Sequence, residues 1–130
     1  MYVVLDTNVL VSALWSENGV CARILSMVLN GLITPCYDHR VLEEYRMVLL
    51  RPRFRFSEND VEDILSYIRA SGMSVIAPPL SIDLPDMSDK KFFEIGTRMD
   101  AVIVTGNIKH FPAYEKVFSP VDFLKHFFDV

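Results

Sequence analysis

The feature that most constrains the fold of this chain is an alternation of strand-like and helical segments without the tight turns that join hairpins. β-branched and apolar runs predict strands at residues 2–5, 32–37, 73–78, 101–107 (with an exit turn) and 115–118. Helical periodicity and capping residues predict helices at residues 9–15, 20–31, 39–50, 57–71, 86–99 and 120–130. Strands that alternate with helices pair in parallel. We therefore expect an α/β fold whose parallel sheet is covered on both faces.

Length and composition favour one soluble domain spanning residues 1–130. A chain of 130 residues buries a sizeable core without disulfides or structural metals. Its 13 basic and 17 acidic residues argue against broad electrostatic binding to nucleic acid, but leave room for a small acidic site with a local basic rim. Cys21 and Cys36 have no metal-ligand spacing. With no signal peptide or membrane span in the sequence, we expect a cytoplasmic protein with reduced thiols.

Polar side chains gather where the expected strands end. A carboxylate inside an apolar run is costly to bury unless a cation or hydrogen bonds receive it. In open parallel sheets, functional residues lie beyond the carboxyl ends of the strands. The residues concerned are Asp6, Thr7 and Asn8 after the first strand, Asp86 and Asp89 after the third, and Thr105, Gly106 and Asn107 after the fourth. We expect them to meet at one edge of the sheet.

Carboxylates brought together in this way predict a metal site. Like charges a few ångströms apart raise one another's pKa unless a cation neutralises them. A set without Cys or His is hard and oxygen-rich, which favours Mg²⁺ or Mn²⁺ over zinc. Water bound to such a metal can attack a phosphodiester while the metal stabilises the leaving oxygen. The residue types therefore indicate metal-dependent phosphoryl chemistry.

Four segments resemble the successive motifs of the PIN-domain family. They are VVLDTNVLVSAL, LEEYRMVLLRPRF, PDMSDKKFFEIG and DAVIVTGNIKHFP, and their order and spacing match across nearly the whole chain. The chain is most similar to the branch described as toxins of prokaryotic toxin–antitoxin pairs. The resemblance implies a three-layer α/β/α, Rossmann-like domain with four to five parallel strands. It also implies Mg²⁺- or Mn²⁺-dependent cleavage of single-stranded RNA, a small antitoxin partner and a homo-oligomer, dimeric or larger.

The resemblance assigns catalytic and metal-binding roles to four acidic residues. Asp6 matches the first metal-binding Asp of the family, and Asp89 matches the Asp of the D-x-x-F pattern. Glu44 matches the helical Glu because it directly precedes a tyrosine, with Glu43 as the alternative. Only one of two adjacent helical residues can face the site, because they point about 100° apart. Asp86 lies three residues before Asp89, on the same side of a helical turn.

The fourth acidic position departs from the family pattern. Many PIN domains carry T-G-D where this chain has Thr105, Gly106 and Asn107. An asparagine is a neutral oxygen ligand or a hydrogen-bond donor, so we expect a second metal to be weakened more than the first. Asn8, or Thr7, is expected to orient Asp6 or a bound water.

Basic residues allow several interpretations. Arg51, Arg53 and Arg55 alternate with aromatic residues, which suits RNA phosphate contact and base stacking, an antitoxin-binding groove or a solvated loop. Lys109 and His110 are candidates for the rim of the acidic site, together with the lysines at positions 90 and 91. His110 could also act as a general base.

Structural alternatives remain for the acidic residues. Asp6, Asp86 and Asp89 could be helix caps, and the paired glutamates could be solvated charges. Two other functions also remain. One is a phosphatase of haloacid-dehalogenase type with a nucleophilic Asp, although its D-x-D pattern is D-T-N here. The other is a catalytically weak PIN domain that binds RNA or protein.

Overall fold

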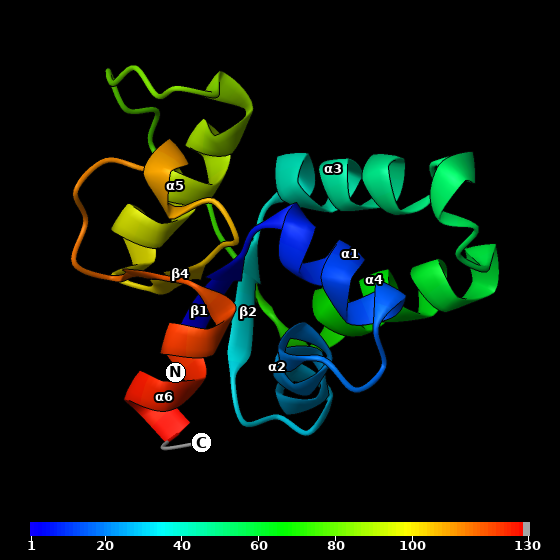
Figure 1. Cartoon of the computed structure of the whole chain (residues 1–130). Helices are drawn as coiled ribbons and strands as arrows, with labels where there is room; N and C mark the ends of the chain where they lie inside the picture. Colours follow the sequence, from blue (N-terminus) through cyan, green and yellow to red (C-terminus); the bar gives the residue numbers. More distant parts are fainter. Residues whose placement is uncertain (129–130) are drawn as a thin grey trace.

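The structure, a computed structural model that describes residues 1–128, contains one five-stranded parallel sheet flanked by helices (Figure 1). The strand order is β3-β2-β1-β4-β5, and every neighbouring pair is parallel. The strands are β1 Tyr2–Leu5, β2 Thr34–Tyr37, β3 Met73–Ser74, β4 Val102–Val104 and β5 Val117–Phe118. This architecture confirms the predicted three-layer α/β/α, Rossmann-like fold.

Six α-helices and three short 3-10 helices connect and cover the strands of the described chain. The α-helices are α1 Thr7–Trp15, α2 Val20–Leu29, α3 His39–Leu49, α4 Glu58–Ser71, α5 Lys90–Met99 and α6 Pro120–Phe128. The 3-10 helices are η1 Pro52–Phe54, η2 Met87–Asp89 and η3 Ile108–His110. Helix α1 packs against α2 and α3, and α5 packs against β1, β2 and β4.

Several predicted boundaries were wrong; among them, the helix expected at 9–15 starts at Thr7 and the strand expected at 115–118 is confined to Val117–Phe118. The strand expected at 32–37 starts only at Thr34, because the backbone amides of residues 32 and 33 still bond to the carbonyl of Met27 at the end of α2. The strand expected at 73–78 ends at Ser74 on the sheet edge, ahead of two prolines that cannot donate to a ladder. The helix expected at 86–99 is divided into η2 and α5, and the final residues of the helix expected at 120–130 lie outside the described residues.

The apolar core fixes the two central strands. Val4 and Ile103 are fully buried in β1 and β4, and Phe92 of α5 is buried as well. Gly96 of α5 allows a close approach, because a Cβ there would lie 2.7 Å from Cδ1 of Ile103. This packing places the carboxyl ends of β1 and β4 side by side.

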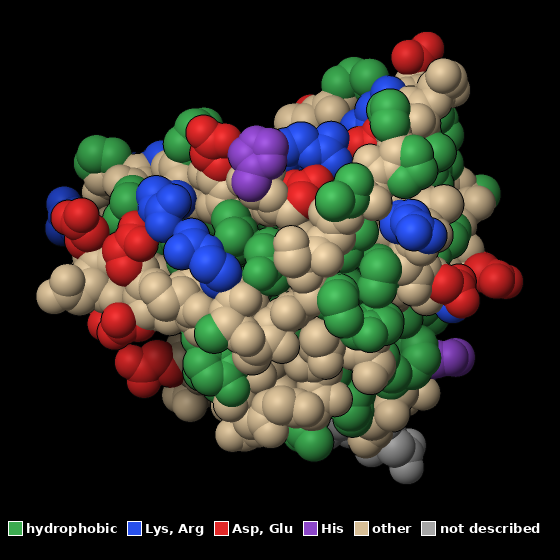
Figure 2. Space-filling model, turned by 180° about the vertical axis from the view of Figure 1, so that it is seen from behind, with side chains coloured by type: hydrophobic (Ala, Val, Ile, Leu, Met, Phe, Trp, Pro, Cys, Tyr) green, Lys and Arg blue, Asp and Glu red, His purple; other side chains and the backbone are tan. Residues whose placement is uncertain are grey.

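The surface carries charges of both signs. Figure 2 shows Lys and Arg side chains interspersed with Asp and Glu on the face seen from behind, without a broad basic field on that face. Within residues 1–128, no helix has the length and apolar character needed to cross a membrane.

Candidate active site

The carboxyl ends of β1 and β4 bring Asp6 and Thr105 into contact. Leu5 pairs with Val104 in the sheet, so the next residue of each strand lies at the same edge. The Thr105 hydroxyl donates a 2.7 Å hydrogen bond to Asp6 Oδ2. Asp6 is 5% exposed and Thr105 is fully buried. Although Asp6 precedes α1, its carboxylate makes no capping hydrogen bond, so the helix-cap alternative does not explain it.

The segments D-T-N and T-G-N form one hydrogen-bonded unit. Asn8 Nδ2 donates to Asp6 Oδ2 over 3.3 Å, while Asn8 Oδ1 accepts from the amide of Gly106 over 3.1 Å. The amide of Asn107 donates a 3.0 Å hydrogen bond to the Thr105 hydroxyl. Asn8 and Thr105 therefore orient the Asp6 carboxylate directly. Asn107 is exposed and supports this arrangement only through its backbone amide, which binds Thr105.

Glu44 extends from α3 toward the same edge of the sheet. Its Oε2 accepts a hydrogen bond from the Thr7 hydroxyl, and its Oε1 lies 2.6 Å from the Lys91 ammonium. Glu43 is exposed and makes neither contact. Helix α3 is set in place by Asp38, which caps it by accepting from the Val41 amide over 3.0 Å. Of the two glutamates, Glu44 is thus the one that faces Asp6 and its neighbours.

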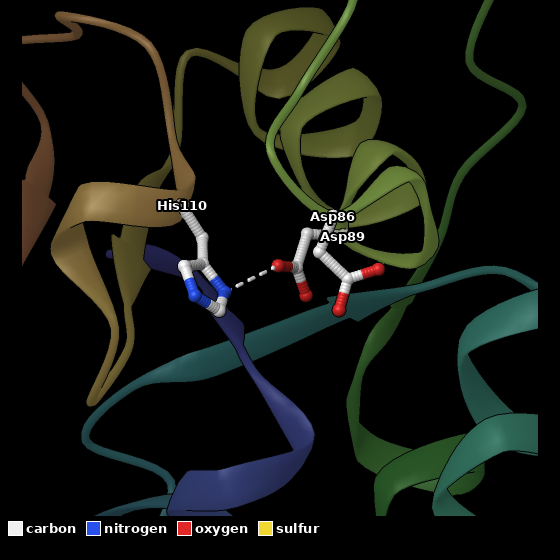
Figure 3. Close-up of side chains that lie close together, drawn as sticks. All are labelled: Asp86, Asp89 and His110. Carbon is white, nitrogen blue, oxygen red and sulfur yellow. Dashed lines mark hydrogen bonds and ion pairs between the residues drawn. The ribbon is translucent and has the colours of Figure 1, made fainter.

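A second acidic group lies between η2 and η3 (Figure 3). Each of Asp86, Asp89 and His110 offers one ligand atom, and these atoms all lie within 4.8 Å of one another. Figure 3 shows His110 projecting from η3 toward the two carboxylates, with Nδ1 3.1 Å from Asp89 Oδ2. Asp86 is exposed and also caps η2, because its Oδ1 accepts from the amide and hydroxyl of Ser88.

The pKa shifts show how these carboxylates affect one another. Burial raises the pKa of Asp6 from 3.8 to about 6, against the lowering effect of the Thr105 hydrogen bond, and the charges of Asp89 and Glu44 raise it further. Burial also raises the pKa of Asp89, which the hydrogen bond with His110 partly offsets. The hydrogen bonds from Ser88 lower the pKa of Asp86. For both Asp6 and Asp89, burial and neighbouring carboxylates thus outweigh the hydrogen bonds that favour the charged form.

Comparison of the sequence with known proteins assigns the chain to a family. Residues 2–109 match the PIN domain family, a segment that contains every predicted acidic site residue and ends one residue before His110. The chain belongs to the PIN-domain family. It is also 32% identical over 108 residues to an uncharacterized protein of Methanocaldococcus jannaschii, a match that covers 81% of this chain and 70% of that protein. PIN domains are typically nucleases and generally use divalent metals.

The donor atoms of this PIN domain suit a hard divalent cation. Carboxylate oxygens are the ligands that Mg²⁺ and Mn²⁺ prefer. Within residues 1–128, one group of three or more His, Cys, Asp or Glu side chains has all its ligand atoms within 4.8 Å of one another. It consists of Asp86, Asp89 and His110. The sequence led us to expect oxygen ligands alone. In the structure the imidazole of His110, which the sequence suggested for the rim of the site, lies beside two of these carboxylates. Glu44 is near enough to raise the pKa of Asp6, but both residues lie outside that close group.

The basic residues of the PIN domain divide into two places. Lys109 and His110 belong to η3, beside the acidic group. Arg51, Arg53 and Arg55 belong instead to η1 and its flanks, beyond the end of α3. The sequence offered both sets as possible contacts for RNA or a protein partner, and the structure places them in different elements.

Sequence reasoning missed two supporting contacts. Lys91 was treated as a rim residue, but it is the ion-pair partner of Glu44. Glu94 was not singled out; it is 3% exposed and accepts from Arg40 over 2.9 Å and from the Leu80 amide over 2.8 Å. Glu94 thereby anchors the loop that leads to Asp86. Its only sequence signal is a charge on the apolar face of α5.

Proposed function

We propose that this PIN domain is a Mg²⁺- or Mn²⁺-dependent endoribonuclease that cleaves phosphodiester bonds of single-stranded RNA. The observation that carries the proposal is the buried Asp6 carboxylate, whose pKa is raised to about 6 by burial, with Asp89 and Glu44 adding to the shift. A divalent cation would compensate these charges, and phosphate oxygens of a substrate commonly complete such a coordination shell. The family match favours this activity over the phosphatase alternative.

Each acidic residue has a distinct part in the proposed site. Asp6, Glu44 and Asp89 would hold the cation, with Asp86 at the exposed side. The bound metal would supply an activated water and stabilise the leaving oxygen. Thr105 and Asn8 both donate to Oδ2 of Asp6 and so fix the orientation of its carboxylate.

The remaining polar residues position the ligands. Lys91 neutralises Glu44 and, with Thr7, holds its carboxylate toward the site. The hydrogen bond between Nδ1 of His110 and Asp89 orients the imidazole ring. Lys109, in the same short helix, is suited to contact a substrate phosphate at the rim.

The deciding experiment is a cleavage assay with a fluorescent single-stranded RNA. Wild-type protein is incubated with Mg²⁺, with Mn²⁺ and with EDTA, beside the Asp6→Asn variant. We expect cleavage by the wild type only with metal, and loss of most of it in a folded Asp6→Asn protein. Full activity of that variant would contradict the site assignment. Lack of any cleavage by the wild type would instead favour a PIN domain that binds RNA or protein without cutting.

We further propose that the protein acts in the cytoplasm as the toxin of a type II toxin–antitoxin pair, with a small antitoxin and as a homo-oligomer. Its support is the resemblance of the four sequence motifs to the toxin branch. Large exposed apolar side chains are compatible with partner surfaces, among them Leu32 and Ile76. Expression should arrest growth, and co-expression of a neighbouring small reading frame should restore it. Growth unaffected by an active enzyme would argue against the toxin role.

A further inference from the structure

Two exposed helix stripes lead away from the proposed active site. Helices α1 and α3 are packed against each other, and both start at the carboxyl edge of the sheet (Figure 1). On each helix, four of the partly or fully exposed positions have the spacing i, i+3, i+4, i+7, which is one face of a helix. On α1 they are Asn8, Val11, Ser12 and Trp15, and on α3 and its end they are Glu44, Met47, Val48 and Arg51. Each stripe begins at a residue of the proposed site.

Helix α1 contacts α3 near the site and the segment that follows α3 at the far end. Near the site, the Thr7 hydroxyl donates to Glu44. At the far end, the ring of Trp15 lies 6.0 Å from that of Phe54 and 6.1 Å from that of Phe56, in edge-on arrangements. Helix α1 has nine residues, so the far end lies about 13 Å from the site. That is about the length of four nucleotides at the stacked spacing of one strand.

The far end carries aromatic rings that water can reach. Trp15 is 65% exposed and is the only tryptophan of the chain. Phe54 and Phe56 stack with centroids 5.5 Å apart and planes inclined by 12°. Single exposed apolar residues are common, but three rings in mutual contact form a platform. We call Trp15, Phe54 and Phe56 the aromatic platform.

Three arginines lie next to two rings of the aromatic platform in the sequence, and one of them contacts a ring. Arg51, Arg53 and Arg55 are exposed, and residues 51–56 contain no acid, although the chain as a whole has a net charge of −4. The guanidinium carbon of Arg53 lies 4.9 Å from the centroid of the Phe54 ring. Rings flanked by guanidinium groups are the combination that proteins use to stack bases and contact phosphates of single strands.

We propose that the aromatic platform and its three arginines bind the single-stranded RNA several nucleotides away from the bond that is cut. The RNA would follow the exposed stripes of α1 and α3 from the acidic site to Trp15. A single strand fits better than a duplex, whose base faces are already stacked, and better than an acidic peptide, which lacks planar groups for three rings. The inference rests on the proposed ribonuclease function, because that function supplies the RNA at the other end of the stripes.

Binding is tested without metal, so that cleavage cannot interfere. Wild-type protein in EDTA is titrated with an oligouridine of about 12 nucleotides, within the usual site sizes for single-strand binding. Trp15 fluorescence reports from the platform itself, since no other tryptophan contributes. We expect saturable quenching by the single strand, and much weaker quenching by a duplex of equal length. No quenching by the oligouridine would overturn the proposal.

Variants then locate the contact. Trp15→Leu and Arg53→Gln should each weaken binding of a labelled oligouridine about tenfold, whereas Trp15→Phe should retain most of it. Arg98→Gln, which removes an exposed charge from the last turn of α5, serves as the matched control and should bind like wild type. Melting curves verify that each variant is folded. Unchanged binding by folded Trp15→Leu and folded Arg53→Gln would overturn the proposal and point to a protein ligand for this surface.

A cleavage comparison separates this inference from the proposed function. With Mn²⁺, the ratio of kcat/KM for the oligouridine to kcat/KM for a dinucleotide should fall about tenfold in Arg53→Gln. An unchanged ratio in an active enzyme would overturn the platform while leaving the ribonuclease intact. A wild type that cleaves neither substrate, but binds the oligouridine through Trp15, would overturn the ribonuclease and support the RNA-binding platform.

Discussion

The ammonium group of Lys91 lies 2.6 Å from Oε1 of Glu44 and joins the first turn of α5 to the middle of α3. The two side chains are only 13% and 22% exposed, so this ion pair is less screened by water than a surface pair. Its positive charge lies among carboxylates that would otherwise repel one another. Lys91 therefore partly takes the place of a cation in the metal-free protein.

Replacing Lys91 with glutamine should have opposite effects with and without metal. In EDTA, Lys91→Gln should lower the free energy of unfolding by about 1–3 kcal/mol, because Glu44 loses its partner beside Asp6 and Asp89. With Mn²⁺, the variant should show a larger increase in melting temperature than wild type, since the site is one charge more negative. Lys90→Gln is the matched control, one residue earlier. Equal metal-induced shifts in the two variants would place Glu44 away from the bound metal.

Asp6 should make the metal-free protein less stable as the pH rises. Its pKa is raised from 3.8 in the unfolded chain to about 6 in the folded protein, chiefly by burial, so the folded state holds the proton more tightly. The stabilisation of the folded state by the Asp6 proton is therefore fully present below pH 3.8 and is lost as the pH rises through about 6. A shift of this size corresponds to about 3 kcal/mol.

The Asp6→Asn variant isolates this effect because its side chain is neutral at every pH. In EDTA, the stability of the variant relative to wild type should increase by about 2.5 kcal/mol between pH 4 and pH 7.5. Chemical denaturation at several pH values measures the difference. Mn²⁺ should stabilise wild type and leave the variant nearly unchanged. A pH-independent difference in EDTA would mean that Asp6 keeps an ordinary pKa in the folded protein, and equal stabilisation of both proteins by Mn²⁺ would mean that Asp6 is not a metal ligand.

The edge of the sheet that holds Asp6 and Thr105 could be predicted from the sequence, because topology alone brings them together. Parallel strands present their carboxyl ends at one edge, so two local patterns suffice to place residues that are 99 positions apart. The division of the segment 86–99 was not foreseen. Its first turn is tightened by Asp86, which binds the Ser88 amide, and only then does α5 begin at Lys90.

Contacts that depend on side-chain direction could not be predicted. The Lys91–Glu44 pair spans 47 positions and joins two helices whose relative rotation no local pattern reveals. The contact of Trp15 with Phe54 depends in the same way on how α1 packs against α3. Glu44 was preferred to Glu43 from the resemblance, and the structure shows that Glu44 faces Thr7, but its catalytic role stays a prediction.

The paired glutamates provide a test of that role. Glu44→Gln should lower Mn²⁺-dependent cleavage by about 100-fold or more, because it removes a charged ligand from the proposed site. Glu43→Gln removes an equal charge from the exposed neighbour and should leave activity unchanged. Steady-state cleavage of single-stranded RNA compares the two. The opposite order would mean that the site is formed from the other face of α3.

Replacing Arg55 should affect the stability of the protein and its binding of RNA in opposite directions. It adopts φ 56° and ψ 27° at the end of η1, in the left-handed region that favours glycine. Arg55→Gly should relieve that conformation and raise the free energy of unfolding by at most about 1 kcal/mol, because glycine also gains freedom in the unfolded chain. The same change removes a guanidinium beside the aromatic platform, so it should weaken oligouridine binding.

Asp100 is the matched control, since it has φ 51° at the end of α5 and lies 2.7 Å from Lys116 at the surface. Asp100→Gly should change stability by a similarly small amount and leave oligouridine binding as in wild type. Thermal melts and fluorescence titrations on the two variants decide the matter. If Arg55→Gly destabilised the protein and bound RNA normally, the Arg55 side chain would serve the packing of η1 instead. If both variants lost affinity equally, binding would follow general changes in the protein rather than the guanidinium beside the platform.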